Sequence, residues 1–425
     1  MPNAPPPQHV LSLDPTLARK IVDLHRWALG QGLRGVAVET LLDDLCQQLV
    51  IAGVPLWRGF AGMRTLHPRW GGHGYTWRRD LNAIGHDQFE RGVDNNPDWV
   101  DSPFAYLVAQ SRITDGVPSL RRRLAGPEAQ LDFPVLKSFA GAGATDYFAQ
   151  FFHFGPKGDA SYGTGVAYSF ATDGPQGFLD DDLVLLRAVL PAASLAIMAK
   201  AGHTIARSLL EAYLGGDAGR RVHAGAIDRG SVETIWAVLW FADIRGFTAI
   251  ADAVPGPVLI ALLNDAFETL TAALRPRGGQ VLKFLGDGML AIFPCSEATQ
   301  EEVCQRALDA AAEAMAALET INDERRAAGQ PIAAVDLALH LGEVLYGNVG
   351  AVDRLDFTVI GPAVNEVARI EALCQPLGRN LLLTAEFAAS MSDRTRLEPL
   401  GKHALRGVRE PREIFGWAQP RAAST

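Results

Sequence analysis

Two aspartates at the ends of apolar segments are the residues most able to do chemistry in this sequence. Asp243 stands at the end of the nearly unbroken apolar run IWAVLWFADI, which is typical of a buried central strand. Asp287 lies between glycines in VLKFLGDGMLAIF, where two apolar runs around Leu-Gly-Asp-Gly predict a tight β-hairpin. Paired carboxylates in glycine-rich backbone suit hard cations that carry a triphosphate, whereas a single buried aspartate is as often a turn or cap residue.

Three other polar residues could act together with these carboxylates. Lys283 interrupts the first strand of the hairpin, where a lysine taken alone indicates an edge strand with its amine in water. Asn365 and Arg369 are four residues apart in PAVNEVARIEAL and therefore share one helical face. An arginine fork can bind phosphate oxygens, and an asparagine can position a ribose or a phosphate. Because such a pair by itself is more often a surface feature, the hypothesis depends on its combination with the carboxylates.

Elements of alternating type position these residues in the C-terminal half. From residue 235 onward, the expected order is β-α-β-β-α-β with additional C-terminal strands. This order predicts a mixed α/β fold in which helices cover a sheet that contains antiparallel pairs. In a β-α-β-β arrangement the first strand lies beside the hairpin, so Asp243 and Asp287 can meet. The helices are expected at Pro257–Leu274, from about Glu297 to Ala328, and from Pro362, a residue well suited to a first helical turn.

The N-terminal half has a different organisation. A β-like segment from Gly165 to Ala171 leads through a turn to the acidic helix start Asp180–Asp182, and a long apolar helix follows. This strand, acidic start and helix resemble the end of a GAF domain, a regulatory sensor fold, and the resemblance identifies no ligand. The polar stretch Asp217–Ser231 is the best linker candidate. The predicted domains are a GAF-like α/β regulatory or dimerisation domain over residues 1–205, a helical linker over 206–230 and a catalytic domain over 231–425.

Four motifs in the C-terminal half occur in one order and at compatible spacing. They are FADIRGFT at 241–248, LKFLGDGMLAIF at 282–293, HLGEVLYGNVG at 340–350 and FTVIGPAVNEVARIE at 357–371. Together they resemble the motif set of the class III nucleotidyl cyclases, and the match extends through nearly the whole of residues 235–418. The resemblance implies the ferredoxin-like βαββαβ catalytic fold of that family.

The resemblance also implies how the carboxylates and the turn after them are used. Asp243 and Asp287, with the backbone carbonyl of Ile244, would bind two magnesium or manganese ions. A metal pair of this kind activates an attacking oxygen and stabilises charge that develops on phosphorus. The turn beginning at Arg245, which opens the next helix, would offer backbone N–H groups to phosphates. The residues of that turn that would bind substrate are Gly246, Phe247 and Thr248.

On the phosphate side, the resemblance implies that Asn365 orients the ribose and Arg369 stabilises the transition-state phosphate. The ribose 3′-oxygen then attacks the α-phosphate, pyrophosphate leaves and a cyclic nucleotide remains. Two positions depart from the family pattern. Arg406 in LRGVREP stands where many relatives have a lysine that contacts the terminal phosphates, and because arginine keeps the charge we expect function to survive. Pro362 replaces the more usual Asp or Asn, with an effect expected only at the helix start.

Lys283 and Thr358 occupy the positions that read the purine in this family. Adenine presents an acceptor at ring nitrogen 1 and a donor on its exocyclic amine, which a lysine donor and a hydroxyl acceptor fit. Guanine reverses this pattern, and relatives specific for GTP typically carry glutamate at the position of Lys283. The pair therefore favours ATP as the substrate.

Sites in this family form between two head-to-tail subunits, one of which supplies the metal aspartates while the other supplies the base-reading pair, asparagine and arginine. This chain carries both sets, so the resemblance implies a homodimer with two complete sites and an inactive monomer. The leading hypothesis is a soluble adenylate cyclase regulated at its N-terminal domain by an unknown small molecule or protein. The alternatives are a guanylate cyclase and a catalytically silent nucleotide-binding or scaffold protein, and the N-terminal domain could serve only for dimerisation.

Charge and composition argue against several other classes of protein. The net charge of −9 and the pI near 5.6 argue against non-specific nucleic-acid binding, and the basic run Arg121–Arg123 is expected on a solvated face. The four cysteines are scattered without zinc spacing, as in a reduced cytoplasmic protein. The proline-rich start MPNAPPPQHV lacks a signal-peptide pattern. The longest apolar run, Leu183–Ala199, contains Arg187 and Pro191, so no membrane span is expected.

Overall fold

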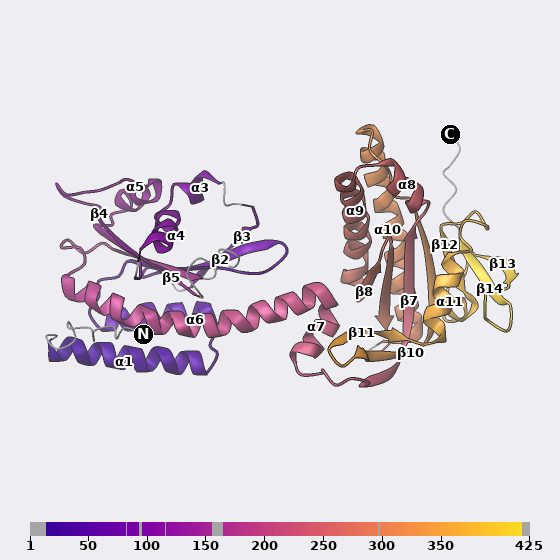
Figure 1. Cartoon of the computed structure of the whole chain (residues 1–425), viewed down its shortest axis with the longest axis horizontal. Coiled ribbons are helices and arrows are strands. Elements are labelled where there is room, and N and C mark those ends of the chain that lie inside the picture. The colour runs from indigo at the N-terminus through magenta and orange to yellow at the C-terminus, as the bar shows by residue number, and fades with distance from the viewer. Residues whose placement is uncertain are drawn as a thin grey trace. The chain divides into compact units, whose positions relative to one another are not determined.

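The computed structural model describes residues 14–81, 83–92, 96–114, 116–154, 165–295 and 298–418 of the 425-residue chain. The proline-rich start lies outside these residues, as does Glu297 at the expected beginning of the long helix. The chain divides into two compact units, Met1–Leu209 and Leu210–Thr425. Each unit has its own sheet (Figure 1).

The first unit is built on a six-stranded antiparallel sheet with the strand order β3-β2-β1-β6-β5-β4. Its strands are β1 (Arg58–Arg64), β2 (Trp70–Arg78), β3 (Gly85–Glu90), β4 (Ser119–Arg123), β5 (Asp146–His153) and β6 (Gly165–Thr172). β5 and β6 bury nearly every residue, as strands do when both faces of a sheet are covered. β6 confirms the strand that the sequence predicts from Gly165 to Ala171.

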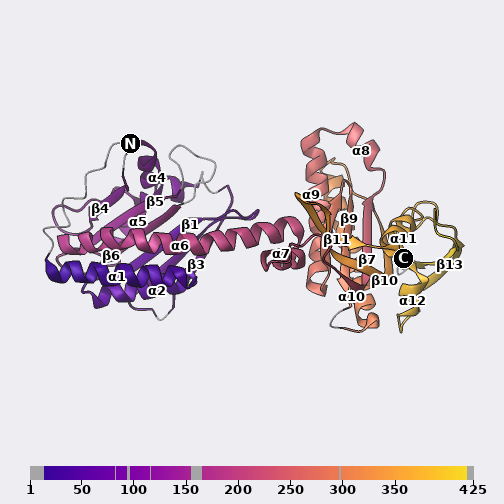
Figure 2. The same cartoon turned by 60° about the horizontal axis from the view of Figure 1, so that its bottom comes forward.

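Helices cover both faces of this sheet (Figures 1 and 2). They are α1 (Pro15–Leu33), α2 (Val38–Ile51), α3 (Pro97–Val100), α4 (Pro103–Ile113), α5 (Pro134–Gly141) and α6 (Asp180–Leu214). α1, α2 and α6 contribute to one core, in which Leu42 and Leu186 are fully buried. α4 and α5 contribute to a second core around Leu107 and Leu136. The sheet is thus sandwiched between two apolar cores.

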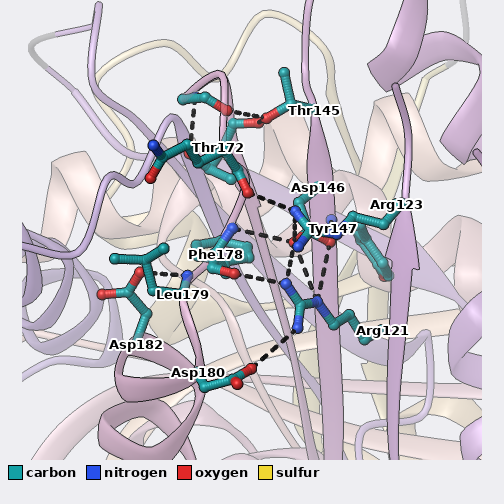
Figure 3. A network of polar contacts seen from close by, with 12 residues as sticks. Arg121, Arg123, Thr145, Asp146, Tyr147, Thr172, Phe178, Leu179, Asp180 and Asp182 are labelled. Atoms are coloured by element: carbon teal, nitrogen blue, oxygen red, sulfur yellow. Dashed lines mark hydrogen bonds and ion pairs between the residues drawn. The ribbon is translucent and has the colours of Figure 1, made fainter. Parts of the chain in front are cut away.

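A buried carboxylate on β5 joins the arginines of β4 to the chain that leads into α6 (Figure 3). The Oδ2 atom of Asp146 accepts hydrogen bonds from Arg121 Nη2 at 2.8 Å and from the backbone N–H of Phe178 at 3.1 Å. Arg123 Nη1 lies 3.3 Å from the same oxygen. Asp146 is fully buried, and a buried charge persists only when it is paired in this way. The expected solvated face for the basic run is therefore wrong, because Arg121 and Arg123 turn inward onto Asp146.

The second unit contains an eight-stranded sheet with the order β13-β14-β12-β10-β7-β9-β8, and β11 pairs with β10. Its strands are β7 (Val232–Ile244), β8 (Gln280–Leu285), β9 (Gly288–Pro294), β10 (Val335–Ala351), β11 (Arg354–Ile360), β12 (Leu381–Thr384), β13 (Leu397–His403) and β14 (Arg412–Trp417). β7 lies between β9 and β10. The predicted central strand beside the hairpin is thereby confirmed.

Seven helical elements accompany this sheet. They are α7 (Gly216–His223), α8 (Phe247–Ala253), α9 (Gly256–Leu274), η4 (Arg275–Arg277), α10 (Gln300–Ala327), α11 (Pro362–Glu371) and α12 (Ala385–Ala389), among the residues that the structure describes. Alternate residues of β7 point to opposite faces: Trp240 lies in a core with α9 and α10, and Leu239 in a core with α11. The element order confirms the predicted mixed α/β fold, and Pro362 begins α11 as expected.

Among the residues that the structure describes, two helices are long and apolar enough to cross a membrane, which overturns the expectation of no membrane span. Mean hydropathy reaches 1.8 within Asp180–Leu214 and 1.3 within Gly256–Arg277. The expectation relied on Arg187 and Pro191, but a spanning helix tolerates one proline and an occasional charge. Inside the structure, 56% of the apolar stretch of the first helix and 33% of that of the second are buried.

The Asp146 network predicts a large stability effect for a conservative substitution. Asp146→Asn keeps the shape but removes the charge that compensates the two arginines, so the free energy of unfolding should fall by about 3 kcal/mol. Urea denaturation of the full chain measures this. Asp132→Asn is the matched control, because Asp132 also pairs with an arginine, Arg122, but has a side chain that is 46% exposed. Asp132→Asn should lower the free energy of unfolding by less than about 1 kcal/mol. Equal losses of unfolding free energy in the two variants would contradict the argument.

Candidate active site

Carboxylates from four elements gather at the C-terminal end of β7. Asp243 lies near the end of β7, directly opposite Asp336 on β10 and Gly288 on β9. Asp287 occupies the two-residue turn between β8 and β9, after Gly286, whose φ of 72° is the left-handed conformation such a turn requires. Glu371 is the last residue of α11. Strand pairing therefore places Asp243, Asp287 and Asp336 in one acidic group.

The electrostatics of this group show that its charges are only partly compensated. Burial raises the pKa of Asp243 to about 6, and the neighbouring carboxylates of Asp287 and Asp336 add to the effect. Burial likewise raises the pKa of Glu371 to about 7, with further contributions from Asp243, Asp336 and Asp287, while Arg245 acts in the opposite direction. Carboxylates with raised pKa values in one place are typical of a site that binds a cation.

Arg245 neutralises one member of the group. Its guanidinium forms a two-pronged pair with Asp336, with Nε donating to Oδ2 at 3.0 Å, and its backbone N–H donates to the carbonyl of Ala334 at 2.7 Å. Asp336 is buried, so this pair holds the carboxylate in place. Arg245 thus compensates the charge of Asp336, whereas the charges that act on Asp243 come from carboxylates.

The residues present fit a divalent cation that is bound together with phosphates. Asp243 and Asp287 supply hard oxygen ligands, and the backbone carbonyl of Ile244 is next to Asp243 in the chain. A Cβ atom at Gly288 would lie 3.0 Å from Asp243 Oδ1, so glycine leaves room beside the carboxylate. Across the described residues, no group of three or more His, Cys, Asp or Glu side chains is arranged to hold a metal ion by itself. Two carboxylates would therefore need further oxygens, which a triphosphate could supply.

A second group of residues lies on β8 and β11. The amine of Lys283 donates a hydrogen bond to Asp356, and Lys283 stands at an irregularity in the pairing of β8 with β9. Thr358 follows Asp356 by two residues on β11, so both side chains are on one face of the strand. The structure thus brings Lys283, Asp356 and Thr358 to one side of the β10–β11 hairpin, and we call these three residues the base-side group.

α11 presents its polar residues in different directions. Asn365 is exposed and Arg369 is half-buried, and they share a face. A Cβ atom at Gly407 would lie 3.6 Å from Arg369 Nη2, which places Arg369 beside the loop that carries the exposed Arg406. Glu371, two positions further on, points to the acidic group on roughly the opposite side of the helix. Arg369 therefore faces away from the aspartates of its own chain.

The predicted phosphate-binding turn lies next to the acidic group. Gly246 precedes the short helix α8, and its carbonyl accepts hydrogen bonds from the N–H groups of Ala249 and Ile250. The N–H groups of Phe247 and Thr248 belong to the first positions of α8, where a helix leaves its donors without intrahelical partners. Gly246, Phe247 and Thr248 thus follow Asp243 and Ile244 with only Arg245 between them.

Thr358 and Asp243 lie at different levels of the sheet, whereas Lys283 lies near the level of Asp243, because it pairs with Leu290, which pairs with Phe241. Asp336 near the start of β10 pairs with Asp243, whereas Gly347, far along the same strand, pairs with Thr358. The structure brings Asp243 and Asp287 together, and it brings Lys283 and Thr358 to the same side. A single chain does not place Thr358 beside Asp243 along the strand. The separation along the strand therefore concerns Thr358 and not Lys283.

Three residues of these groups were not found by sequence reasoning. Asp336 is a carboxylate inside the apolar strand AAVDLALHL, and such a buried charge is a signal that could have been used. Asp356 precedes Thr358 by two residues, so strand periodicity places it on the same face. Glu371 had no local signal, because only the packing of α11 brings it to the acidic group.

Comparisons with known proteins concern the second unit. The family model described as the adenylate and guanylate cyclase catalytic domain matches residues 233–416. The adenylate cyclase of Anabaena cylindrica is 35% identical over 170 residues, which are 39% of this chain and 33% of that protein. Adenylate cyclase 1 of Rhizobium meliloti (strain 1021) is 28% identical over 177 residues, which are 41% of this chain and 26% of that protein. The matches span a third or less of these relatives.

Solved structures overlap with the chain in part. A bacterial light-regulated adenylyl cyclase aligns with a TM-score of 0.47 at 25% identity, over 55% of this chain and 67% of that chain. The adenylyl cyclase CyaB from P. aeruginosa aligns with a TM-score of 0.42 at 23% identity, over 45% and 97% of the two chains. The guanylyl cyclase Cya2 aligns with a TM-score of 0.39 at 24% identity, over 45% and 96%.

The raised pKa values predict an unusual pH dependence for the metal-free protein. Folded Asp243 and Glu371 keep their protons to higher pH than they do in the unfolded chain. The free energy of unfolding should therefore fall as pH rises from about 4 to about 7. Thermal unfolding in a chelator over this range measures the fall.

Asp243→Asn should make this fall smaller, because an amide does not ionise, and the exposed Asp252→Asn should leave it unchanged. Manganese should raise the unfolding temperature more at pH 7 than at pH 5, since metal binding requires ionised ligands. An identical pH profile for Asp243→Asn and the native chain would show that the acidic group does not act in this way.

Proposed function

Residues 233–416 form a class III adenylate and guanylate cyclase catalytic domain, and on that premise we propose that the protein converts ATP to 3′,5′-cyclic AMP and pyrophosphate. In this reaction the ribose 3′-oxygen forms a bond to the α-phosphorus and loses its proton. The bond from that phosphorus to the β,γ-diphosphate breaks, and pyrophosphate leaves. The acidic group and the base-side group are the parts of the chain assigned to these events.

The residues of the acidic group would hold the metal ions. Asp243, Asp287 and the carbonyl of Ile244 are the proposed ligands of two magnesium or manganese ions. When bound, divalent ions lower the pKa of the attacking hydroxyl and neutralise charge on the phosphates. Asp336 holds Arg245 and so fixes the backbone just before the turn whose N–H groups, at Gly246, Phe247 and Thr248, would bind phosphate oxygens.

The residues of α11 and the loop beside it would act on the reacting phosphate. Asn365 is exposed and can orient the ribose by hydrogen bonds, which brings its 3′-oxygen in line with the α-phosphorus. Arg369 can donate a planar fork of N–H groups to the phosphate as negative charge develops. Arg406 lies in the loop that contacts Arg369 and would bind the terminal phosphates.

The choice of ATP rests on one observation, the pairing of Lys283 with Asp356 on the same side as Thr358. A lysine donor matches ring nitrogen 1 of adenine, and the oxygens of Asp356 and Thr358 can accept from its exocyclic amine. Guanine carries a hydrogen on ring nitrogen 1, so this nitrogen and the amine of Lys283 would both be donors and could not form a hydrogen bond. We therefore propose adenylate rather than guanylate cyclase activity.

The active form is proposed to be a head-to-tail homodimer. Arg369 faces away from the acidic group of its own chain, and Thr358 lies at a different level of the sheet from Asp243. A second chain related by a two-fold axis would bring its base-side group and α11 to these aspartates. By the same symmetry, the first chain would bring its own base-side group and α11 to the aspartates of the second chain. Regulation by the first unit, and its GAF-like identity, stay predictions.

The direct test is the production of cyclic nucleotide by the purified full-length chain. ATP and GTP are supplied separately, first with magnesium and then with manganese. We expect cyclic AMP from ATP and little cyclic GMP from GTP. Cyclic GMP as the main product would overturn the substrate assignment, and no product from a folded dimer would favour a catalytically silent protein.

Complementation between two inactive variants tests the shared site. Asp243→Ala should lower kcat at least about 100-fold by removing a metal ligand, and Arg369→Ala should do the same by removing transition-state stabilisation. Mixed subunits form heterodimers with one intact site, so an equal mixture should recover about one quarter of the native activity. Steady-state rates of the mixture measure this.

The control mixture is Asp243→Ala with Asp287→Ala. Both substitutions remove ligands of the same half-site, so every dimer in that mixture lacks a complete site. Its rate should stay at the level of the single variants. Recovery in both mixtures, or in neither, would refute the head-to-tail arrangement.

Reversing the charge of the base reader should change the preference for nucleotides. Lys283→Glu replaces the donor by an acceptor, so the ratio of kcat/KM for ATP to that for GTP should fall about 10- to 100-fold. Lys402→Glu is the control, because Lys402 is an exposed lysine on β13 in the same unit. An unchanged ratio in Lys283→Glu would remove the base-reading role of Lys283.

A further inference from the structure

The segment after α6 packs against both strands that carry the base-side group. We call residues 215–231 the connector, which includes α7. Gly215 has φ of 87°, and a Cβ atom there would lie 2.6 Å from the carbonyl oxygen of Val281 on β8. Ala218 of α7 is buried in the same core as Leu282 of β8 and Phe357 of β11. The connector thus approaches Val281, two residues before Lys283, and shares a core with the residues immediately before Lys283 and Thr358.

A polar network fixes α7 to β10. The hydroxyl of Tyr346 donates to Asp217 Oδ2 at 3.1 Å, and Arg221 Nε lies 2.8 Å from the same oxygen. The guanidinium of Arg221 also lies over the Tyr346 ring, 5.3 Å from its centroid. Tyr346 is only 2% exposed, so its hydroxyl has exchanged water for Asp217. This hydrogen bond ties the connector to the β10–β11 hairpin.

The rest of the connector is attached to the same hairpin by Asn348. Its side-chain Nδ2 donates to the carbonyl of Ala226 at 2.8 Å. Its backbone carbonyl accepts from Gly230 N–H at 2.9 Å, and its own N–H donates to Ser231 at 3.0 Å. Asn348 is buried, so these bonds are costly to break. These bonds attach the last part of the connector to the hairpin, as the Tyr346–Asp217 bond attaches α7.

Strand alternation transmits the position of the connector to the base-side group. On β11, Phe357 points toward the connector, and its neighbours Asp356 and Thr358 point to the other face. Phe357 also meets Tyr346 edge to face, with ring centroids 4.9 Å apart. A cavity of about 90 Å³ lies between parts of the connector and the hairpin; it is lined by Leu214, Val222, Ile227, Asn348, Leu355 and Phe357.

We propose that the connector positions the purine-reading residues, with Tyr346 and Asp217 as the positioning residues that hold the β10–β11 hairpin against α7. This inference rests on the proposed function of Lys283 and Thr358. A displaced connector would shift β8 and β11 and so change the affinity for the purine more than the chemical step. Because α6 ends at Leu214, directly before Gly215, any change at the end of α6 reaches the connector through the chain.

The first test removes one hydroxyl. Tyr346→Phe in the full-length chain keeps the ring packing but loses the bond to Asp217. KM for ATP should rise about two- to tenfold, as expected for the loss of one hydrogen bond, while kcat changes less than twofold. The ratio of kcat/KM for ATP to that for GTP should fall. Tyr213→Phe is the matched control, because Tyr213 is 82% exposed and should change none of these values.

A second pair of variants separates positioning from mere stabilisation. Asp217→Asn keeps an acceptor for the Tyr346 hydroxyl and should retain most of the native KM, whereas Asp217→Ala should reproduce Tyr346→Phe. If the bond served stability alone, the variants would lower the unfolding temperature and leave KM and the ATP-to-GTP ratio at native values. That result would overturn the proposal.

A readout that does not need turnover distinguishes this proposal from the proposed function. Amide hydrogen exchange in Tyr346→Phe should become faster in residues 346–360 and 280–285, and stay at the native rate in Tyr213→Phe. ATP binding by calorimetry with manganese replaces KM if the native chain is inactive. A native chain that binds no nucleotide refutes the proposed function. Native-like binding and exchange in Tyr346→Phe, beside a native chain that binds ATP, refutes only the role of the connector.

Discussion

The pairing of β7 with both β9 and β10 is the constraint on which the rest of the second unit depends. This pairing sets Asp243 opposite Asp336 and beside the turn that carries Asp287. Burial, together with like charges held this close, raises the pKa of Asp243, and a bound cation would compensate these charges. Arg245 pairs with Asp336 and thereby fixes the chain that follows β7. The strength of the sheet thus maintains an electrostatic arrangement that isolated side chains would avoid.

β10 connects the acidic group and the base-side group of the second unit. Its first residues carry Asp336, and its last residues pair with β11, which carries Asp356 and Thr358. The two faces of the sheet are used differently: α9 and α10 cover one, and α11 and α7 contribute to the core on the other. A polar residue on β8 or β11 therefore has an apolar neighbour in sequence that packs on the opposite face. This alternation explains how the connector could influence Lys283 and Thr358, which point to the other face of the sheet.

The first unit follows the same physical rule in a different setting. Asp146 is buried, and it is stable there because Arg121, Arg123 and the N–H of Phe178 surround it (Figure 3). The bonds to Phe178 hold the chain that enters α6, the longest helix among the described residues. In both units a buried carboxylate fixes the chain at the end of a strand or the start of a helix. In the second unit the compensation is left incomplete, and there the proposed chemistry is found.

The sequence by itself determined the local features: the hairpin with its glycine turn, the shared face of Asn365 and Arg369, the element order and the family motifs. These follow from periodicity and turn chemistry, which act over a few residues. Only the tertiary structure decided which distant residues meet. The pairing of Arg121 with the buried Asp146, the hydrogen bond of Lys283 with Asp356, the approach of Glu371 to the aspartates and the apolar length of α6 were missed or misjudged. The physical reason is that charge environment and burial depend on partners that strand pairing and helix packing bring from far along the chain.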